Sequence, residues 1–597
     1  MMCCAASAGL LLAGCVRENP VGNTPEVVPE ARITAFAFQE LKTAIVDIEE
    51  RAAAASRITV YVPDALDARR LTPDITFEGV SITPPSGAAQ DFSQKVSYTL
   101  KAANNAEKQY DVVLQKSNST KAITSFGIKD TEFVGEPAGS AISLFVHAGI
   151  DLTRFAPYVE FKGYSLSPGA ADTVDFTNPV VYTVTATDGS TAKYTVHVQK
   201  YRLPVMFLYT PKPIDSKDEW VEDATYTLYD GERQQPSGRT YAGKLDVKGR
   251  GNTTWYVFDK KPYTLRLAPG GKAALLRMPA QRHWVLLANH ADKTLIRNAL
   301  AFKIGEIFNA MPWTPRSEQV ELFLNNEYAG VYQLTEQIRL DENRVNVSEI
   351  SSANPEGGYL MELVHSLTDI PYFRTHRSRE GYYIANDNDG AAIAVNVKDP
   401  DTNLDGVWER ITTRVQEAEN AIYAADFKNE NTGYRKYFDE ASIVDFYLQN
   451  EIVENPDVDH GSVYFYYNPD IKKYVFGPGW DFDLTLGNYP DMGNNKFLVR
   501  HEAYWLPRIL DDEYITARIK ARWAEKKNAV QNLLQFIDDE AAYLDGAQQR
   551  NFNRWDVLGK AVYPGSPVHY SYEAELQYLT EYFENRIAWI DAHINEL

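Results

Sequence analysis

The sequence of 597 residues contains an internal duplication, in which residues 33–116 and 123–200 are copies of one another. The copies end alike: residues 96–102 read VSYTLKA and 110–116 read YDVVLQK, while 180–186 read VVYTVTA and 194–200 read YTVHVQK. Apolar and polar residues alternate along these segments, β-branched residues are frequent, and glycine or proline separates them. This pattern predicts two small all-β domains, each an antiparallel sandwich, over residues 32–117 and 121–201.

The first fifteen residues predict export. The three cysteines of the chain, Cys3, Cys4 and Cys15, all lie here, so the rest of the sequence supplies no thiol for a disulfide or a metal site. Residues 5–14 are small and apolar, and residues 12–15 read LAGC. Residues 1–15 therefore resemble a lipoprotein signal peptide, whose cleavage leaves Cys15 as a lipidated N-terminus. No Lys or Arg precedes the apolar run, and an ordinary secretory peptide or a piece of a buried helix is the alternative.

Residues 16–31, with their proline, glutamate and asparagine, predict a linker. No later apolar run approaches the roughly 18 residues that a membrane-spanning helix needs. We therefore expect the lipid to be the only membrane attachment, at the cell envelope, on either face of the outer membrane. The sequence leaves the oligomeric state open.

Overall charge limits the partners. A formal net charge of −21 and an isoelectric point near 5.0 argue against general nucleic-acid binding, which requires clustered Lys and Arg. A local basic pocket for a nucleotide remains compatible with this charge.

From about residue 202 the pattern changes. Strand-like alternation at 226–229, 244–248 and 260–267 is followed by a helical stretch over 294–308 and a hairpin formed by 320–324 and 328–334. Strands mixed with helices predict an α+β domain over residues 205–595.

The segment 442–488 contains the residue types that phosphoryl transfer needs. A capping box at Ser442 predicts an amphipathic helix through about 453, closed by Pro456, which leaves Asp457 in a loop. A hairpin over 463–476 then leads to Asp481 and Asp483. Protein kinases use this order, with a loop Asp that accepts the proton of the attacking hydroxyl and a second Asp, beyond a hairpin, that binds metal.

These motifs, taken in order, resemble the CotH kinase family, the spore-coat CotH-like atypical protein kinases. The resemblance covers about 205–595 and rests on six segments: RGNTTW at 250–255, KPY at 261–263, DKTLIRN at 292–298, EYAGVYQLTE at 327–336, NPD at 455–457 and WDFD at 480–483. The two repeats look like the immunoglobulin-like modules that precede catalytic domains in surface lipoproteins of Bacteroides-type bacteria. The expected architecture is thus multidomain: two immunoglobulin-like sandwiches followed by an α+β protein-kinase-like domain.

The resemblance implies an ATP-dependent kinase, a transferase assisted by Mg²⁺ or Mn²⁺ that phosphorylates Ser or Thr of exported or surface proteins. It implies Asp457 as the catalytic base and Asp481 as the principal metal ligand, with Asp483 beside it. The remaining candidates bind the nucleotide: Arg250 and Asn252 in a glycine-flanked turn suited to phosphate oxygens, Lys261 as the nucleotide lysine, and Glu336 or Asp292 to orient a cation or the ribose.

One position departs from the family. Where an Asn five residues after the catalytic Asp is common, this chain has Ser462, whose hydroxyl is a poorer metal ligand, so that Asp459 or Asp483 would have to compensate. The alternative function is therefore a weak or inactive kinase-like scaffold that binds glycan or peptide. Metal-dependent hydrolysis is disfavoured because His and Cys are nearly absent at ligand spacing, and His460 is interpreted as a polar loop residue. The repeats are interpreted as a spacer.

Overall fold

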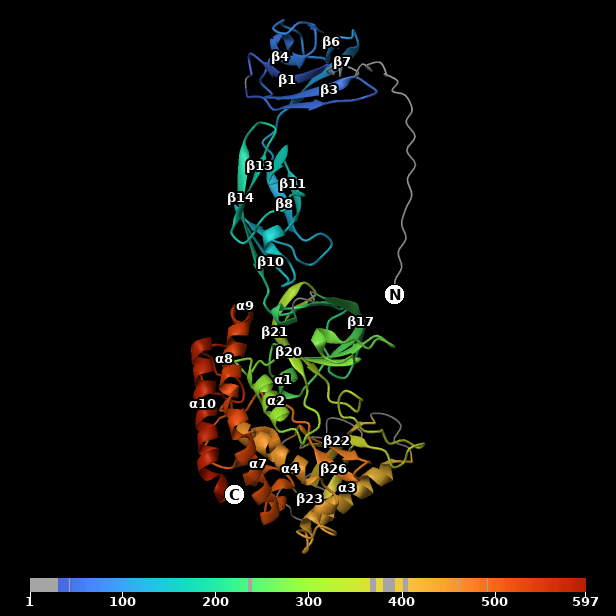
Figure 1. The fold of residues 1–597 in the computed structure, drawn as a ribbon, viewed down its shortest axis with the longest axis vertical. Helices are drawn as coiled ribbons and strands as arrows, with labels where there is room; N and C mark the ends of the chain where they lie inside the picture. Colours follow the sequence, from blue (N-terminus) through green and yellow to red (C-terminus); the bar gives the residue numbers. More distant parts are fainter. Residues whose placement is uncertain are drawn as a thin grey trace, which may run out of the picture. The chain divides into compact units, whose positions relative to one another are not determined.

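The computed structural model describes residues 31–41, 43–234, 239–364, 372–378, 392–400, 406–459, 461–490 and 492–597 (Figure 1). The predicted signal peptide with Cys15, most of the linker, His460 and the side chain of Asp459 lie outside the described residues. The chain divides into two compact units, one formed by residues 1–144 and 152–198 and the other by 145–151 and 199–597. In the described part of the chain, no helix combines the length and the apolar character that crossing a bilayer requires.

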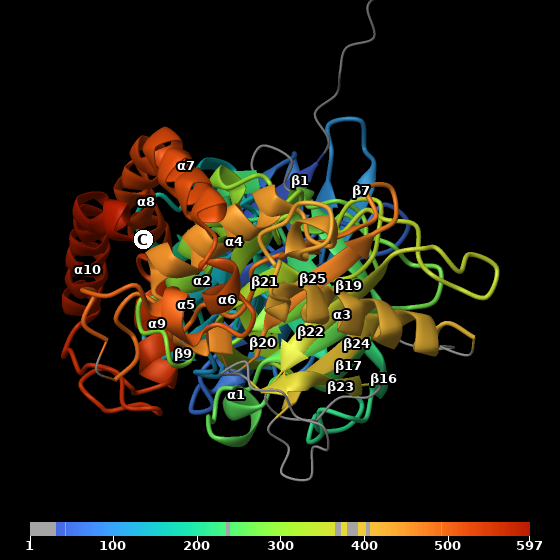
Figure 2. The same cartoon turned by 90° about the horizontal axis from the view of Figure 1, so that it is seen from below.

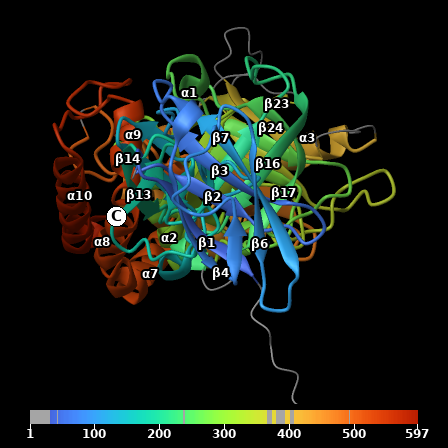
Figure 3. The ribbon, with the colours of Figure 1, turned by 90° about the horizontal axis from the view of Figure 1, so that it is seen from above.

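The first repeat is all-β (blue in Figure 3). Two strands, β1 (Arg32–Phe38) and β4 (Pro73–Glu78), pair antiparallel. A second sheet has the order β2 (Val46–Glu49), β3 (Ser56–Val62), β7 (Glu107–Lys116), β6 (Val96–Lys101), β5 (Ser81–Thr83). Apolar residues of both sheets, among them Phe36, Val60 and Tyr98, share one core. Because apolar and polar residues alternate along the strands, each sheet has one apolar face, and the two apolar faces pack against each other.

The second repeat has the corresponding strands. β8 (Ala122–Gly127) pairs with β11 (Tyr158–Lys162), and a five-stranded sheet has the order β12 (Ser165–Ser167), β13 (Val180–Thr185), β14 (Thr191–Lys200), β10 (Ala141–Val146), β9 (Glu136–Ala138). In both copies the second-last strand has 6 residues and the last strand has 10. The N-terminal region is therefore all-β and duplicated, as predicted.

The expectation of purely antiparallel sheets is wrong. In the first repeat β3 and β7 run parallel, with Val60 opposite Leu114. Alternation of apolar and polar residues shows which face of a strand is buried but carries no information on its direction. The chain between the two strands is long enough for the crossover that a parallel pair requires.

The larger unit begins with a closed barrel. Its strands have the order β15 (Val205–Tyr209), β16 (Val221–Tyr229), β17 (Thr240–Gly249), β18 (Tyr263–Leu267), β19 (His283–Leu287), β21 (Glu327–Glu336), β20 (Ser317–Leu324). A parallel pairing of β15 with β20 closes it, and the other neighbours are antiparallel. Val247, Leu265 and Trp284 are among the buried residues that fill its interior.

A second, antiparallel sheet follows in the order β23 (Tyr372–Ser378), β24 (Ala392–Asp399), β22 (Tyr359–Val364), β25 (Val463–Asn468), β26 (Lys473–Phe476). The predicted hairpins are confirmed as β20–β21 and β25–β26. Helix α3 (Trp408–Tyr423) packs against β23 (Figure 2). The other helices are α1 (Thr253–Tyr256), α2 (Arg297–Ile307), α4 (Glu440–Val453), α5 (Leu498–Glu502), α6 (Leu506–Ile509), α7 (Glu513–Gln531), α8 (Leu533–Leu544), α9 (Ala547–Arg554) and α10 (Tyr572–His593).

Helix α4 differs from its prediction at the start and in its burial. Asp439, not Ser442, is the N-cap, and its carboxylate accepts a hydrogen bond from the Ser442 amide at 2.8 Å. The helix is not amphipathic, because every residue from Ser442 to Val453 is buried. Its end is as predicted, since Glu454 adopts a left-handed conformation (φ 50°) that stops the helix before Pro456. This buried helix carries the chain to Asp457.

Candidate active site

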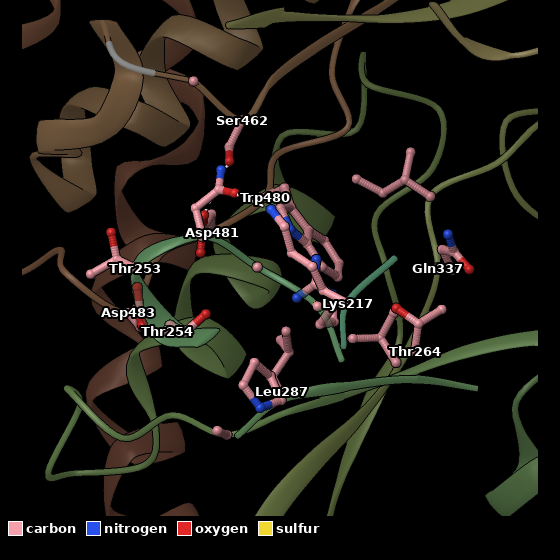
Figure 4. Close-up of a pocket in the computed structure, with 18 of the residues that line it drawn as sticks. Lys217, Thr253, Thr254, Thr264, Leu287, Gln337, Ser462, Trp480, Asp481 and Asp483 are labelled. Carbon is pink, nitrogen blue, oxygen red and sulfur yellow. Dashed lines mark hydrogen bonds between the residues drawn. The ribbon is translucent and has the colours of Figure 1, made fainter. Parts of the chain in front are cut away.

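A cavity of about 920 Å³ lies between the barrel and the second sheet (Figure 4). The turn after β17 and strands β18 and β19 line it from the barrel. From the other side it is lined by β22, β24, β25 and the segments that flank the β25–β26 hairpin. Six of the nine residues predicted for catalysis, metal or nucleotide binding line it: Arg250, Asn252, Asp457, Ser462, Asp481 and Asp483.

The turn after β17 brings backbone amides and a guanidinium to the cavity. Gly251 has φ 80°, and a Cβ there would lie 2.2 Å from Oγ1 of Thr254, so only glycine fits this turn. The guanidinium of Arg250 lies over the Trp480 ring at 5.3 Å, and within the described part of the chain it has no hydrogen-bond or ion-pair partner. Asn252 accepts a hydrogen bond from Nζ of Lys217 at 2.7 Å. The turn therefore offers unsatisfied donors to an anion.

The carboxylates enter from the opposite side. Asp457 lies in a short 3₁₀ helix, Pro456–Asp459, and its amide donates to Oδ1 of Asn455 at 3.0 Å. Asp481 and Asp483 follow β26, and Asp481 has φ 66°. Ser462, with φ 59°, donates through Oγ to Oδ2 of Asp481 at 3.1 Å (Figure 4).

Asp483 is the most desolvated of these acids, with 8% of its surface exposed. Burial raises its pKa well above the usual value, and the negative charges of Asp481 and Asp457 raise it further. The carboxylates of Asp481 and Asp457 are therefore close enough to Asp483 to repel its charge. A cation bound among them would relieve that repulsion.

Helix α2 anchors the segment that carries Asp481 and Asp483. Oδ1 of Asn298 accepts the amide of Phe482, the residue between the two acids, at 2.8 Å. Nε of Arg297 donates to the carbonyl oxygen of Thr485 at 3.0 Å. The position of these acids is thus set by two adjacent side chains at the start of α2.

A family model described as "CotH kinase protein" matches residues 247–590, more than half of the chain. The chain belongs to the CotH kinase family. A second model, described as "SGBP, N-terminal", matches the two repeats, at residues 33–114 and 123–198. The CotH resemblance found in the sequence is therefore confirmed, and the repeats match a Bacteroides-type N-terminal domain, while their immunoglobulin-like character stays a prediction.

Other comparisons are weaker. A crystal structure from Bacteroides thetaiotaomicron described as a "putative glycoside hydrolase" is 24% identical over 20% of this chain and 35% of that one, with a TM-score of 0.14. So low a score carries no argument about fold or function. No curated protein matches the chain.

Three predicted residues of the CotH domain do not line the cavity. Lys261 donates through Nζ to the Trp255 carbonyl oxygen at 2.6 Å. The buried carboxylate of Glu336 pairs with Arg316 at 2.8 and 3.0 Å. Asp292 is likewise paired, with Arg297.

Asp292 acts on the site through Arg297. Its carboxylate, fully buried, accepts a hydrogen bond from Nη1 of Arg297 at 2.6 Å and from the amide of Thr294 at 3.0 Å. Since Arg297 holds the segment after Asp483, Asp292 positions the acids through Arg297, and within the DKTLIRN motif it is Asn298 that lines the cavity.

Sequence reasoning missed several cavity residues of the CotH domain. Cations gather there despite the net charge of −21: besides Arg250, the lining contains Lys217, Lys248, Arg266, Arg339 and Lys398. An ion pair between Lys398 and Glu362, with Nζ and Oε2 3.1 Å apart, also belongs to the lining. Glu362 is the one acid in the strand YLMELV, and an acid in an otherwise apolar strand was the available signal.

His283, which also lines the cavity, is not suited to proton transfer near neutral pH. Burial, together with the charge of Arg339, lowers its pKa to about 3, so the ring is neutral.

The donor set of the CotH cavity fits a hard cation. Among the described residues, no group of three or more His, Cys, Asp or Glu side chains is arranged to hold a metal. Mg²⁺ is, however, commonly bound by one or two carboxylates together with substrate phosphates, and Asp481 and Asp483 supply two. The residues present therefore suit a metal that arrives with a nucleotide.

Proposed function

We propose that the CotH domain transfers the γ-phosphate of ATP to Ser or Thr hydroxyls of exported or surface proteins. The observation that carries the proposal is the convergence of Asp457, Asp481 and Asp483 with Arg250 on one cavity, from segments far apart in the sequence. Phosphoryl transfer depends mainly on positioning and on charge stabilisation, and these groups supply both.

In this proposal each group has a defined task. Asp457 accepts the proton of the acceptor hydroxyl, whose oxygen forms a bond to the γ-phosphorus while the bond to the ADP oxygen breaks. Asp481 and Asp483 hold Mg²⁺ or Mn²⁺, which neutralises phosphate charge when bound. Arg250 and the amides of its turn bind phosphate oxygens, as an unpaired guanidinium is suited to do.

Metal-dependent autophosphorylation of the purified exported chain tests the proposal. We expect labelling from [γ-³²P]ATP with Mg²⁺ or Mn²⁺, and loss of at least about a hundredfold in Asp457→Ala, in the range of general-base catalysis. Asp481→Ala should also abolish labelling. Asp470→Ala, in the exposed β25–β26 turn, is the matched control and should label like the native chain. Labelling that persists in both site variants contradicts the assignment.

Export is a separate part of the proposal. It is supported by the LAGC segment that ends at Cys15. Metabolic labelling with palmitate and membrane fractionation should show a lipidated native chain and an unlabelled Cys15→Ala variant. A native chain that takes up no label would refute lipid anchorage.

A second candidate function is a kinase-like protein that binds a glycan or peptide without turnover. Ser462 favours it, because it offers a hydroxyl where the family resemblance implies an amide, and that hydroxyl is engaged by Asp481. Calorimetry separates the candidates. Binding of a glycan or peptide without any heat from Mg²⁺-ATP supports the second, whereas Mg²⁺-ATP binding with labelling supports the first.

A further inference from the structure

Lys398 and Glu362 form an ion pair on the wall of the cavity. They lie on neighbouring antiparallel strands, β24 and β22, where Glu362 is opposite Asn396 and Lys398 is two residues further on. The register shifts between Val397 and Asp399, so Lys398 is the extra residue of a bulge, and its side chain lies on the cavity side together with that of Glu362. Nζ of Lys398 lies 3.1 Å from Oε2 of Glu362, and both residues line the cavity.

This pair is connected to the metal-binding candidate. The other carboxylate oxygen of Glu362, Oε1, accepts a hydrogen bond from the backbone amide of Ser462 at 3.1 Å. Ser462 in turn donates through Oγ to Asp481 at 3.1 Å. An unbroken series of polar contacts therefore runs from Lys398 through Glu362 and Ser462 to Asp481.

Both ends of the last contact have unusual backbone conformations. Ser462 and Asp481 are non-glycine residues with φ of 59° and 66°. Such a conformation is unfavourable for a residue with a Cβ, so surrounding contacts must maintain it. The contacts available to Ser462 are Glu362 on its amide and Asp481 on its hydroxyl.

Tyr464, Lys398 and Arg250 line the same cavity. Burial raises the pKa of Tyr464, Glu362 raises it further, and Lys398 and Arg250 lower it, which agrees with that common lining.

We propose that Lys398 is the lysine that binds the nucleotide phosphates, and that Glu362 and Ser462 are positioning residues that fix Lys398 and Asp481 relative to each other. The inference rests on the proposed phosphoryl transfer. Lys398 replaces Lys261 as the nucleotide-binding lysine, because Lys261 does not line the cavity and donates to a backbone carbonyl. It also gives Ser462 a task that needs a hydroxyl donor rather than a metal ligand.

Two of the other cations of the lining pair with acids outside this series of contacts. Arg266 forms two hydrogen bonds with Asp246 and covers the Trp220 ring. Arg339 pairs with Asp399. All three cations are therefore paired with an acid, and the acid that pairs with Lys398 is the one that contacts Ser462 and, through it, Asp481.

Calorimetric titration of the full exported chain tests the role of Lys398. We expect Lys398→Ala and Lys398→Met to weaken ATP and ADP binding about tenfold or more, the value of one charge-assisted phosphate contact, and to leave adenosine binding unchanged. Lys398→Arg should retain most of the affinity. Lys303→Ala, which breaks a surface ion pair with Glu306, is the matched control and should bind like the native chain. Circular dichroism shows whether each variant is folded.

Kinetics tests the positioning residues. Ser462→Ala should lower kcat by about 10- to 100-fold, as loss of an orienting contact on a metal ligand typically does, with less than a twofold change in the KM for ATP. Ser462→Thr, which keeps the hydroxyl, should recover most of kcat. Glu362→Gln should lower kcat and raise the KM for ATP, since it contacts both partners.

The outcomes distinguish the two proposals. A native chain that binds no ATP refutes the phosphoryl-transfer proposal and with it this inference. If the native chain binds ATP and the Lys398→Ala and Lys398→Met variants bind it with an affinity within twofold of the native value, the inference is overturned but the phosphoryl-transfer proposal is not. So does loss of ATP binding in Lys261→Ala but not in Lys398→Ala. Unchanged kcat in Ser462→Ala overturns the positioning role.

Discussion

Asn298 offers a direct test of how the acidic segment is held. Its side chain is 3% exposed, and Oδ1 accepts the amide of Phe482 while Nδ2 donates to Oδ1 of Asn289 at 3.0 Å. Asn298→Ala leaves a buried amide and a buried amide oxygen without partners. Each orphaned group costs about 1–3 kcal/mol, so for the two groups we expect a loss of about 2–6 kcal/mol. The loss should fall on the segment between Asp481 and Asp483.

Hydrogen–deuterium exchange followed by mass spectrometry measures this effect locally. A loss of 2 kcal/mol corresponds to about thirtyfold faster exchange, so the amide of Phe482 should exchange at least that much faster in Asn298→Ala. Phosphoryl transfer should fall with it, because the two acids lose their fixed separation. Asn528→Ala, on the exposed face of α7, is the control and should leave exchange at Phe482 unchanged.

One result would refute the reasoning. If Phe482 exchanges as slowly in Asn298→Ala as in the native chain, its amide is held by something other than Asn298. Helix α2 would then not be the element that orders the acidic segment.

Three further outcomes follow from single contacts. Burial lowers the pKa of Lys260 to about 7, so the unfolded chain binds more protons than the folded one between about pH 7 and 10.4. The free energy of unfolding, measured by denaturant titration, should therefore rise with pH across that window, and Lys260→Met should flatten the rise. Gly251→Ala forces a Cβ to within 2.2 Å of Oγ1 of Thr254 at φ 80°, and should lower stability by about 1–3 kcal/mol and weaken ATP binding; unchanged calorimetry would contradict the role of the turn. Arg586→Met leaves the buried carboxylate of Glu451, 2.7 Å away, without its cation, and a loss of about 3–5 kcal/mol in thermal or chemical unfolding is expected, with a loss below 1 kcal/mol as the refuting result.

Local features of the fold could be predicted from the sequence. The hairpins β20–β21 and β25–β26 follow from turn residues between alternating strands, since turn chemistry and alternation are read within a few residues. The predicted start of α4 is wrong because Asp439 and Ser442 are both good N-cap residues and lie three positions apart. The structure shows that Asp439 caps the helix, since its carboxylate accepts a hydrogen bond from the amide of Ser442.

Long-range pairings could not be predicted. The barrel closes through β15 (Val205–Tyr209) and β20 (Ser317–Leu324), which are far apart in the sequence. Nothing in the residue pattern of either strand indicates that the two run parallel. The same limit hid the contact of Glu362 with Lys398, because it depends on the pairing of β22 with β24.

The candidate site was predictable where order along the chain carried the information. Asp457, Asp481 and Asp483 were found from their spacing around a hairpin, and all three line the cavity. The lysine was harder. Lys260 is 1% exposed and donates to the Val331 carbonyl oxygen, and the neighbouring Lys261 donates to the Trp255 carbonyl oxygen. Neither side chain reaches the cavity, and the sequence alone does not show this.

The distance along the chain between the two walls of the cavity has a consequence for biogenesis. The glycine turn is synthesised before the acidic segment and before helix α10, whose Arg586 holds Glu451 of α4. Contacts between such distant segments form slowly and only when both are present. A nascent chain halted after β21 but before α10 would therefore contain a finished barrel but no working site, so activity would begin only after α10 has been synthesised.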